Sequence, residues 1–338
     1  MGGVKTKSRK NFTMSRKNKF LLLSNIVVIL FVAWLVFFRD NEIDMERERV
    51  EIARMNFPES GLSGVRCEDG ESRPLAIMLA SDVEARPLSG LSKADMIFEM
   101  PVTDSGTTRM MAVFQCEWPE EIGSVRSSRL DFIPLARGLN AIYAHWGGEK
   151  EALEQLNDKV IDNIDAMKYD GTIFYRKPKI KPPHNGFTGN ELLKKAMGML
   201  DYSISETLIT YPHKEPKDFS SASPPVIYKD DFEVAWEYNS EKNSYPRSRG
   251  GKPEIDKNSS EQIEAKAVIL LKTSWSPINK DYIRVKTIGS GEISVYQNGQ
   301  EIKGLWEKKT AGSKLYFYDN QGQEIKFTPG QIWIEIIV

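Results

Sequence analysis

The sequence contains few of the residues and motifs that support common catalytic chemistries. Its 338 residues include three histidines and two cysteines. No HExxH or His-x-His spacing occurs, which argues against a metal site, and neither a GxSxG nucleophile elbow nor a phosphate-binding P-loop is present. The segment "GSGEIS" (289–294) lacks the third glycine of a dinucleotide fingerprint, and a hairpin turn explains it better. We therefore expect no metal and no cofactor, and the sequence favours a protein that is not an enzyme.

An excess of positive charge is also lacking outside the first residues. The net charge is −1, yet residues 1–19 carry seven Lys and Arg side chains and no acidic side chain. Subtracting these seven charges leaves about −8 for the rest of the chain. Nonspecific nucleic-acid binding needs a basic face that neutralises phosphates. The composition therefore predicts no nucleic-acid partner.

A segment without charged residues follows this basic tail. Phe20 to Phe38 reads "FLLLSNIVVILFVAWLVFF", and its nineteen residues suit one membrane crossing. The basic flank is expected to stay in the cytoplasm, which places the chain from about Arg39 onward outside the membrane. A cleavable signal peptide is the alternative, but the segment is long for one and small residues are scarce near its end. We therefore predict a retained transmembrane signal anchor and an extracytoplasmic bulk.

The two cysteines, Cys67 and Cys116, both lie on the outer side in this topology. Thiols in an oxidising compartment often pair, so we predict a disulfide between them. Two separate buried thiols are the alternative. Neither cysteine has a CxxC partner or a histidine nearby in the sequence, which argues against a catalytic thiol.

Beyond the anchor, the residue pattern divides the chain into a stalk and two domains. Residues 39–57 are charged and lack a core pattern, as is typical of a stalk. Residues 58–215 alternate strand-like and helical stretches and predict an α/β domain with a mixed sheet, whereas residues 224–338 predict a mostly β domain of short strands and tight turns. The expected strands of the first domain are 75–79, 96–100, 109–116 and 141–145. Its expected helices are 130–138, 149–156 and one from Thr188, where Thr188 and Glu191 would form a capping box.

Several stretches of these two domains resemble the YerB-like bacterial lipoproteins, an envelope family built on a domain of unknown function. The resemblance runs from about Pro74 to Val338, and its stretches are "RPLAIML", "ARPLSGLSKADMIFE", "TTRMMAVFQ", "IGSVRSSR", "AIYAHWGG", "PPHNGF", "YKDDFEVAWEYN", "NGQEIKGLWEK" and "GQIWIEII". It implies an envelope location and this two-part architecture, but no reaction. Those lipoproteins carry a lipidated cysteine after the signal region. Here no cysteine lies near the apolar segment, so the anchor should be polypeptide and not lipid.

The stretch "IGSVRSSR" (122–129) places two arginines where the following apolar spacing predicts the start of a helix. Cations are unfavourable there, because the amino end of a helix carries partial positive charge, unless an anion lies between them. Guanidinium groups bind phosphate or carboxylate bidentately, and the arginines at such ends of elements are Arg86, Arg109, Arg126 and Arg129. The alternative is internal pairing with Asp82, Asp95, Glu99 or Asp131. Ser127 and Ser128 are candidate nucleophiles, but capping the helix explains them more simply.

Two histidines lie among the same stretches. His145 ends an expected strand, and His184 lies beside Asn185 in a proline-flanked loop. Imidazole titrates near neutrality and suits acid/base work, although a loop histidine also serves to bond the backbone. The candidate ligand-binding set therefore comprises Arg86, Arg109, Arg126, Ser127, Arg129, His145, His184 and Asn185.

Three functions remain open from the sequence. The first is a membrane-anchored envelope protein that binds an anionic ligand such as a cell-wall fragment. The second is an envelope hydrolase in which His145 and His184 act with arginines that stabilise an oxyanion or a phosphate. The third is an interaction module for other envelope proteins. Convergence of the histidines and arginines on one pocket favours the first two, whereas scattered and internally paired arginines favour the third.

Overall fold

The computed structural model describes residues 55–204, 208–222, 226–228 and 233–338, together with the single residues Asn25, Phe31, Trp34, Phe37 and Arg39. The predicted basic tail and nearly all of the predicted membrane span and stalk lie outside the described residues. Within the described residues, no helix is both long and apolar enough to cross a membrane. Residues 57–338 form one compact unit.

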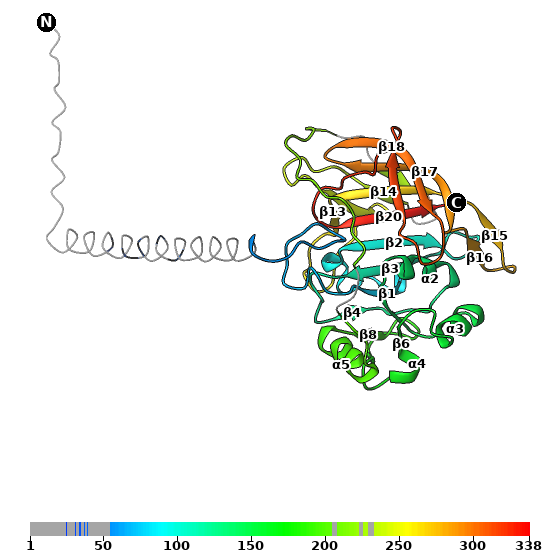
Figure 1. Ribbon diagram of the computed structural model, residues 1–338. Coiled ribbons are helices and arrows are strands. Elements are labelled where there is room, and N and C mark those ends of the chain that lie inside the picture. The colour runs from blue at the N-terminus through cyan, green and yellow to red at the C-terminus, as the bar shows by residue number, and fades with distance from the viewer. Residues whose placement is uncertain are drawn as a thin grey trace, which may run out of the picture. The chain divides into compact units, whose positions relative to one another are not determined.

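A ten-stranded mixed sheet runs through this unit (Figure 1). Its strands, in spatial order, are β19 (Tyr316–Asp319), β18 (Gln300–Lys308), β17 (Gly289–Gln297), β14 (Ala267–Lys272), β20 (Ile332–Ile337), β2 (Met96–Pro101), β3 (Thr108–Phe114), β1 (Leu75–Ala80), β5 (Ile142–His145) and β6 (Asn163–Asp165). The four strands expected in the first domain are confirmed as β1, β2, β3 and β5. Every residue of these four strands is buried, because the sheet is covered on both faces and apolar side chains are needed on both.

Strand β20 joins the two halves of the sequence. It pairs in parallel with β2, where Ile332 lies opposite Met96, and with β14, where Ile332 lies opposite Ala267. The strands of the expected α/β and β domains therefore share one sheet. The first region is mixed α/β and the second is mostly β, as the sequence predicts.

Two apolar cores cover the two faces of this sheet. Helices α2 (Ile133–Gly138) and α3 (Lys150–Asn157) contribute to one core, together with alternate residues of the sheet. Helix α5 (Asn190–Leu200) contributes to the other, as does a five-stranded sheet of β9 (Val226–Tyr228), β10 (Val234–Trp236), β11 (Tyr245–Arg249), β12 (Lys252–Pro253) and β13 (Glu264–Ala265). The alternating burial of β11 fits a strand with one covered face.

Short elements fill the connections. Two small sheets are formed by β4 (Ile122–Gly123), β8 (Gly186–Thr188) and β7 (Tyr175–Arg176), and by the hairpin of β15 (Trp275–Pro277) and β16 (Ile283–Val285). The short helices are η1 (Val83–Ala85), η2 (Leu91–Lys93), η3 (Leu130–Phe132) and α4 (Ala166–Tyr169).

The expected capping box of α5 is wrong. The helix begins at Asn190 with Gly189 in the N-cap position, and no side chain caps it there. Thr188 is instead the last residue of β8, and its buried hydroxyl donates a hydrogen bond to the Ile173 carbonyl oxygen at 2.8 Å. Thr188 therefore belongs to strand β8, although the local sequence motif assigns it to the start of the helix.

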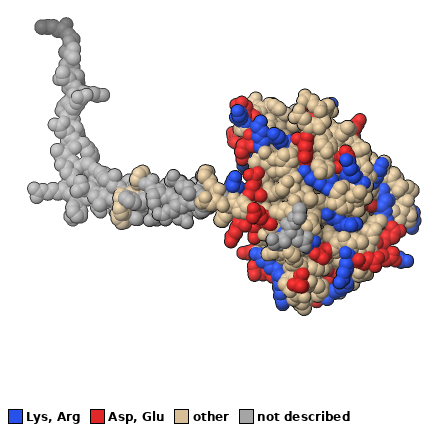
Figure 2. Space-filling view, in the orientation of Figure 1, with Lys and Arg blue, Asp and Glu red and all other residues tan. Residues whose placement is uncertain are grey.

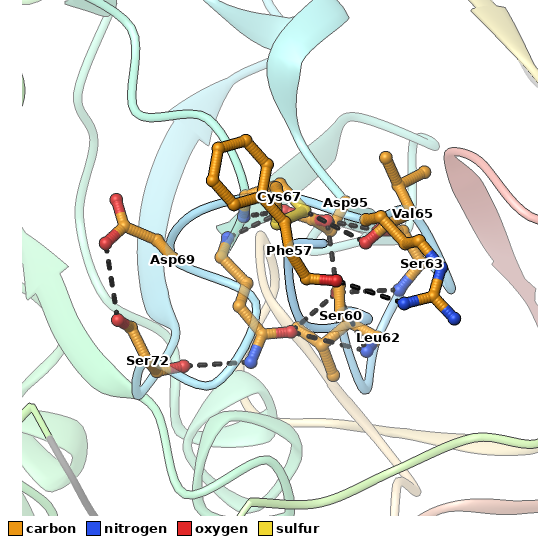
Figure 3. Close-up of a disulfide and its surroundings, with 12 residues drawn as sticks. Phe57, Ser60, Leu62, Ser63, Val65, Cys67, Asp69, Ser72 and Asp95 are labelled. Atoms are coloured by element: carbon orange, nitrogen blue, oxygen red, sulfur yellow. Dashed lines mark hydrogen bonds between the residues drawn. A yellow bond between two sulfur atoms is a disulfide. The ribbon is translucent and has the colours of Figure 1, made fainter. Parts of the chain in front are cut away.

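The predicted disulfide is confirmed between Cys67 and Cys116, which are 49 residues apart (Figure 3). It links the segment that precedes β1 to the residues that follow β3. Asp95 lies beside it and accepts hydrogen bonds from the backbone N–H groups of Gln115 and Cys116, at 2.6 and 3.0 Å. The hydroxyl of Ser63 also donates to Asp95. The disulfide and this buried carboxylate therefore hold the same loop to the sheet.

Candidate functional site

The candidate site lies where two parallel strands separate at their carboxyl ends. Strands β1 and β5 pair only through residues 75–77 and 142–144. Beyond that point residues 124–128 lie between them: the Arg126 N–H donates to the Met78 carbonyl oxygen at 2.9 Å, and the Trp146 N–H donates to the Arg126 carbonyl oxygen at 3.0 Å. In α/β sheets, the carboxyl ends of parallel strands that separate in this way are the usual place for a ligand.

A glycine lets this segment enter the sheet. A Cβ atom on Gly123 would lie 2.3 Å from the Phe187 ring, so a larger residue would push the segment away from β8. The "IGS" part of the sequence motif therefore has a packing role, and it positions the arginines that follow.

Three arginines and one carboxylate meet beside this segment. Arg109 is the second residue of β3 and lies opposite Ala80 at the end of β1, and its Nη1 lies 2.9 Å from the Asp82 Oδ2. The same carboxylate oxygen is 3.8 Å from the Arg126 Nη2 and 4.0 Å from the His184 Nδ1. We call Asp82, Arg109, Arg126, Arg129 and His184 the Asp82 cluster. Among the described residues, Asp82 is the only carboxylate within 4.0 Å of the Arg109 and Arg126 guanidinium groups, and no carboxylate lies within 4.0 Å of the Arg129 guanidinium.

The electrostatics of the Asp82 cluster reflect this imbalance. Burial and then the charge of Arg126 lower the pKa of Arg109 to about 10, and Arg129 adds to the decrease. Burial alone would raise the pKa of Asp82, but Arg109 and Arg126 outweigh it and hold that pKa below its ordinary value. With Asp82 ionised and His184 neutral, three cations face one anion, which leaves two uncompensated positive charges.

Besides its excess of positive charge, the Asp82 cluster contains buried hydrogen-bond donors without a partner among the described residues. The Nε atoms of Arg109, Arg126 and Arg129 are buried, and none has a hydrogen-bond partner among the described residues. The same holds for the His184 Nδ1. A buried donor without a partner costs about 1 to 3 kcal/mol. A bound anion would satisfy several such donors at once.

The start of the helix differs from the sequence expectation. Arg129 occupies the N-cap position of η3, and the Leu130 N–H donates to the Glu149 Oε1 at 2.7 Å. The serines do not cap the helix: the Ser127 hydroxyl donates to the Trp146 carbonyl oxygen at 3.2 Å, and Ser128 bonds the Tyr143 hydroxyl at 3.0 Å. Glu149 therefore supplies the anion at the helix start. The case for a ligand rests on the excess of guanidinium groups, and not on the helix dipole.

The two histidines occupy different environments. His145 is fully buried, its Nδ1 lies 2.8 Å from the Gly147 carbonyl oxygen, and its Nε2 lies 3.4 Å from the Asn163 Oδ1. Burial is the main cause that lowers its pKa. His184 instead belongs to the Asp82 cluster. No hydrogen bond or ion pair between the described residues links the two imidazoles.

Asn185 and Arg86 lie outside the Asp82 cluster. Asn185 is buried, and its Oδ1 accepts a hydrogen bond from the Arg176 Nη1 at 3.2 Å, which holds the loop before β8. The Arg86 Nε donates to the Ser81 carbonyl oxygen at 3.0 Å. The Arg86 side chain also lines a pocket of about 310 Å³ with Arg249 and Glu254. The structure therefore brings together Arg109, Arg126, Arg129 and His184 from the predicted set.

Arg249 belongs to a second cluster, whose residues are all buried. Arg247 lies between three carboxylates: its Nη2 is 2.6 Å from the Glu99 Oε2 and 3.0 Å from the Glu335 Oε1, and its Nη1 bonds Glu254. Arg249 also pairs with Glu99 and Glu254. We call these five residues the Arg247 cluster. Its side chains come from β2, β11, β20 and the turn after β12, so it fastens the five-stranded sheet to the ten-stranded one.

The sequence left open whether the candidate arginines pair with Asp82, Asp95, Glu99 or Asp131, and the structure shows the partners of each of these carboxylates. Glu99 pairs with Arg247 and Arg249, and Asp131 pairs with Arg284 at 3.3 Å. Asp95 bonds serines and backbone N–H groups, as described above. Asp82 pairs with Arg109 and Arg126 of the predicted set.

A second pocket lies next to Arg129 and was not expected from the sequence. It has a volume of about 350 Å³, and its wall includes α3 and the β15–β16 hairpin. The Arg129 guanidinium lies 4.6 Å from the centre of the Tyr282 ring. Tyr282 is more than 150 residues away in the sequence, and no local motif distinguishes it.

The face of the molecule in Figure 2 carries acidic and basic side chains interspersed, without a broad basic surface.

The chain is similar in sequence and in fold to known proteins. Residues 60–203 match the N-terminal domain of the protein family of unknown function DUF3048, and residues 225–334 match its C-terminal domain. The chain is 30% identical over 287 residues to the protein named "Putative lipoprotein YerB" of Bacillus subtilis (strain 168), an alignment that covers 82% of this chain and 85% of that protein. The crystal structure of YerB protein from Bacillus subtilis matches with a TM-score of 0.74 and 27% identity, covering 83% of this chain and 96% of the other. The chain therefore belongs to the YerB-like DUF3048 family.

Proposed function

We propose that this chain is an extracytoplasmic, membrane-attached envelope protein that binds an anionic envelope ligand at the Asp82 cluster. The name of its Bacillus relative, a lipoprotein, supports membrane attachment and an extracytoplasmic bulk. The disulfide is consistent with an oxidising compartment. Phosphate- or carboxylate-bearing cell-wall fragments are the ligands of suitable charge in that compartment.

The anchor differs in kind from that of a lipoprotein. The sequence holds two cysteines, and both form the disulfide, so neither can carry a lipid. The apolar segment from Phe20 to Phe38 is the candidate that remains in this sequence. The proposal is therefore a polypeptide anchor with the amino end in the cytoplasm.

One observation carries the proposed binding function: among the described residues, the three guanidinium groups have buried Nε atoms without a hydrogen-bond partner, and Asp82, which pairs with Arg109 and Arg126, is the one carboxylate within 4.0 Å of any of them. Hydrogen bonds between charged groups contribute about 1.5 to 3 kcal/mol each. An anion with several oxygens would bond more than one guanidinium and neutralise the excess charge. It would do so at the carboxyl ends of β1 and β5, where the chain leaves an opening in the strand pairing.

The experiment measures binding of the full chain in an uncharged detergent. Calorimetric titration with a phosphate-bearing wall-polymer fragment and with a carboxylate-bearing muramyl peptide tests the two anion types. We expect Arg126→Ala to weaken binding at least tenfold. Arg66→Ala serves as the control, because Arg66 is half-exposed and pairs with Glu59 away from the cluster.

Asp82→Asn gives the opposite test at the same place. Asp82 competes with the ligand for the guanidinium groups, so removing its charge should tighten anion binding. The proposal fails if Arg126→Ala and Asp82→Asn both leave the affinity unchanged. It also fails if Arg126→Ala lowers the melting temperature by several degrees and binding is unaffected, because the arginines would then be internal struts.

A further inference from the structure

The pocket beside Arg129 contains groups that the anion site does not use. One wall is the β15–β16 hairpin, which lies on the same side of the molecule as α3 (Figure 1). The hairpin presents Tyr282, whose side chain is 38% exposed, and Asn279 in the turn before it. The Asn279 Oδ1 accepts hydrogen bonds from the backbone N–H groups of Asp281 and Tyr282, at 2.9 and 3.0 Å. The turn therefore fixes the position of the tyrosine.

The opposite wall carries Lys150 and two carboxylates, and Arg284 holds the carboxylates in place. Glu149 and Glu151 line the pocket, and Arg284 donates to both, with Nη1 2.8 Å from the Glu149 Oε1 and Nη2 2.7 Å from the Glu151 Oε2. Each carboxylate keeps acceptor capacity beyond these bonds, because a carboxylate has about four acceptor positions. The wall therefore offers acceptors at fixed positions, without an excess of negative charge that would attract a metal cation.

Arg129 connects this pocket to the Asp82 cluster. Its guanidinium contacts the Tyr282 ring at 4.6 Å, it lines the pocket, and its charge lowers the pKa of both Arg109 and Arg126. In the adjoining Asp82 cluster, Arg109 has an exposed fraction of 5%, and its buried Nε has no hydrogen-bond partner among the described residues. A ligand whose anion reaches the cluster would therefore have the rest of its body beside Tyr282.

The chemistry of the pocket indicates which body fits. An aromatic ring packs against the C–H face of a pyranose, and carboxylate and amide groups at fixed positions bond its hydroxyls. The volume of about 350 Å³ is at the small end of the range for small-molecule sites, about 300 to 1,000 Å³. This is room for a saccharide unit and not for a long peptide.

We infer that the ligand is a saccharide bearing a phosphate or carboxylate group, with its sugar ring in the pocket between α3 and the β15–β16 hairpin and its anion on the Asp82 cluster. This inference rests on the proposed function and adds the ligand class to it. The phosphate and the carboxylate share the required chemistry, and the probes distinguish them.

The experiment compares charged and neutral probes on the full chain in an uncharged detergent. The phosphate series is N-acetylglucosamine 1-phosphate, inorganic phosphate and N-acetylglucosamine. The carboxylate series is N-acetylmuramic acid, lactate and N-acetylglucosamine. In at least one series we expect the charged sugar to bind at least tenfold more tightly than the bare anion and than the neutral sugar.

Variants of the β15–β16 hairpin test whether the tighter binding of the charged sugar depends on Tyr282. Tyr282→Ala should remove the advantage of the charged sugar and leave the affinity for the bare anion within twofold, whereas Tyr282→Phe should keep the advantage because the ring remains. Trp275→Ala is the matched control, because Trp275 is an exposed aromatic residue of the same hairpin that does not line the pocket.

The outcomes separate this inference from the proposed function. If the bare anion binds in an Arg126-dependent manner and the sugar adds nothing, the saccharide inference is overturned and the anion site stands. An advantage of the charged sugar that survives Tyr282→Ala also overturns it. If no anion binds and Arg126→Ala has no effect, both fail.

Discussion

Two arginine clusters lie in the same chain and differ in how their charge is balanced. The Arg247 cluster has two guanidinium groups and three carboxylates, all of them buried. The Asp82 cluster has three guanidinium groups and one carboxylate. The first joins two sheets, and the second lies where two strands separate. The ratio of charges, and not the number of arginines, distinguishes a structural contact from a candidate binding site.

The protonation of the carboxylates shows the difference in detail. In the Arg247 cluster, burial would raise the pKa of Glu99, but Arg249 and Arg247 outweigh it and lower the pKa to about 2. Glu335 lies opposite Glu99 in the register of β2 and β20, and burial raises its pKa to about 7, with the negative charge of Glu99 contributing. The extra carboxyl group therefore holds a proton near neutrality, and the cluster adjusts its own charge. In the Asp82 cluster, burial and the charge of Arg126 outweigh Asp82 and lower the pKa of His184, but a neutral imidazole does not offset the charge of the guanidinium groups.

The largest expected effect comes from removing the central arginine of the Arg247 cluster. Arg247→Met leaves three buried carboxyl groups around a neutral side chain, and breaking a buried ion pair in this way costs about 3 to 5 kcal/mol. Urea denaturation of the full chain should show a loss of this size. A loss below about 1 kcal/mol would remove the distinction between the two clusters, since Arg247 would then be no more structural than a surface residue.

A smaller effect is expected from pH. The folded-state pKa of Glu335 is raised to about 7 from 4.5, so between these values the folded protein binds a proton that the unfolded chain does not. The contribution of Glu335 to stability is therefore complete at low pH and declines as pH rises through this window, by up to about 1.4 kcal/mol per pH unit.

Glu335→Gln tests this dependence. Denaturation measured from pH 5 to pH 8 should give a difference in unfolding free energy, wild type minus variant, that falls as pH rises toward 7. Burial also raises the pKa of Asp131, to about 6, but this group is common to both proteins and cancels in the difference. A difference that is constant over this range would contradict the proton on Glu335.

The smallest expected effect on stability is at the Asp82 cluster. Arg126→Met removes a side chain whose closest carboxylate contact is 3.8 Å and which repels Arg109. We expect the free energy of unfolding to change by less than about 1 kcal/mol. The same substitution at position 247 provides the comparison, and equal losses at the two positions would place both clusters in the structural class.

The sequence predicted the parts of the fold that depend on local pattern. The strand at 75–80 is a continuous apolar run, and the strand at 96–101 is apolar except for Glu99, because both faces of these strands are covered; such runs are visible without a structure. The disulfide followed from the number of cysteines and the topology. Grouping the arginines by their position at the ends of elements gave four candidates, and three of these four belong to the Asp82 cluster.

Other features depend on residues that are distant in the sequence. The start of η3 is capped by Glu149, which arrives with a different helix, so the serines that precede it were misjudged. Arg86 and Arg109 have similar sequence contexts, but in the fold Arg86 lines a pocket with Arg249 and Glu254, whereas Arg109 pairs with Asp82. Tyr282 enters from a hairpin of the second region. No spacing rule connects it to Arg129.

The position of β20 sets the order of events in the biogenesis of this protein. Its partner β2 is synthesised more than 230 residues earlier, since Met96 lies opposite Ile332. Until β20 is available, β2 and β14 each expose an unpaired edge, which is a template for aggregation. Contacts between residues so distant in sequence also slow folding. A chain truncated before β20, such as the first family domain alone, would therefore need protection by chaperones, and the complete sheet can form only after the second region has been released.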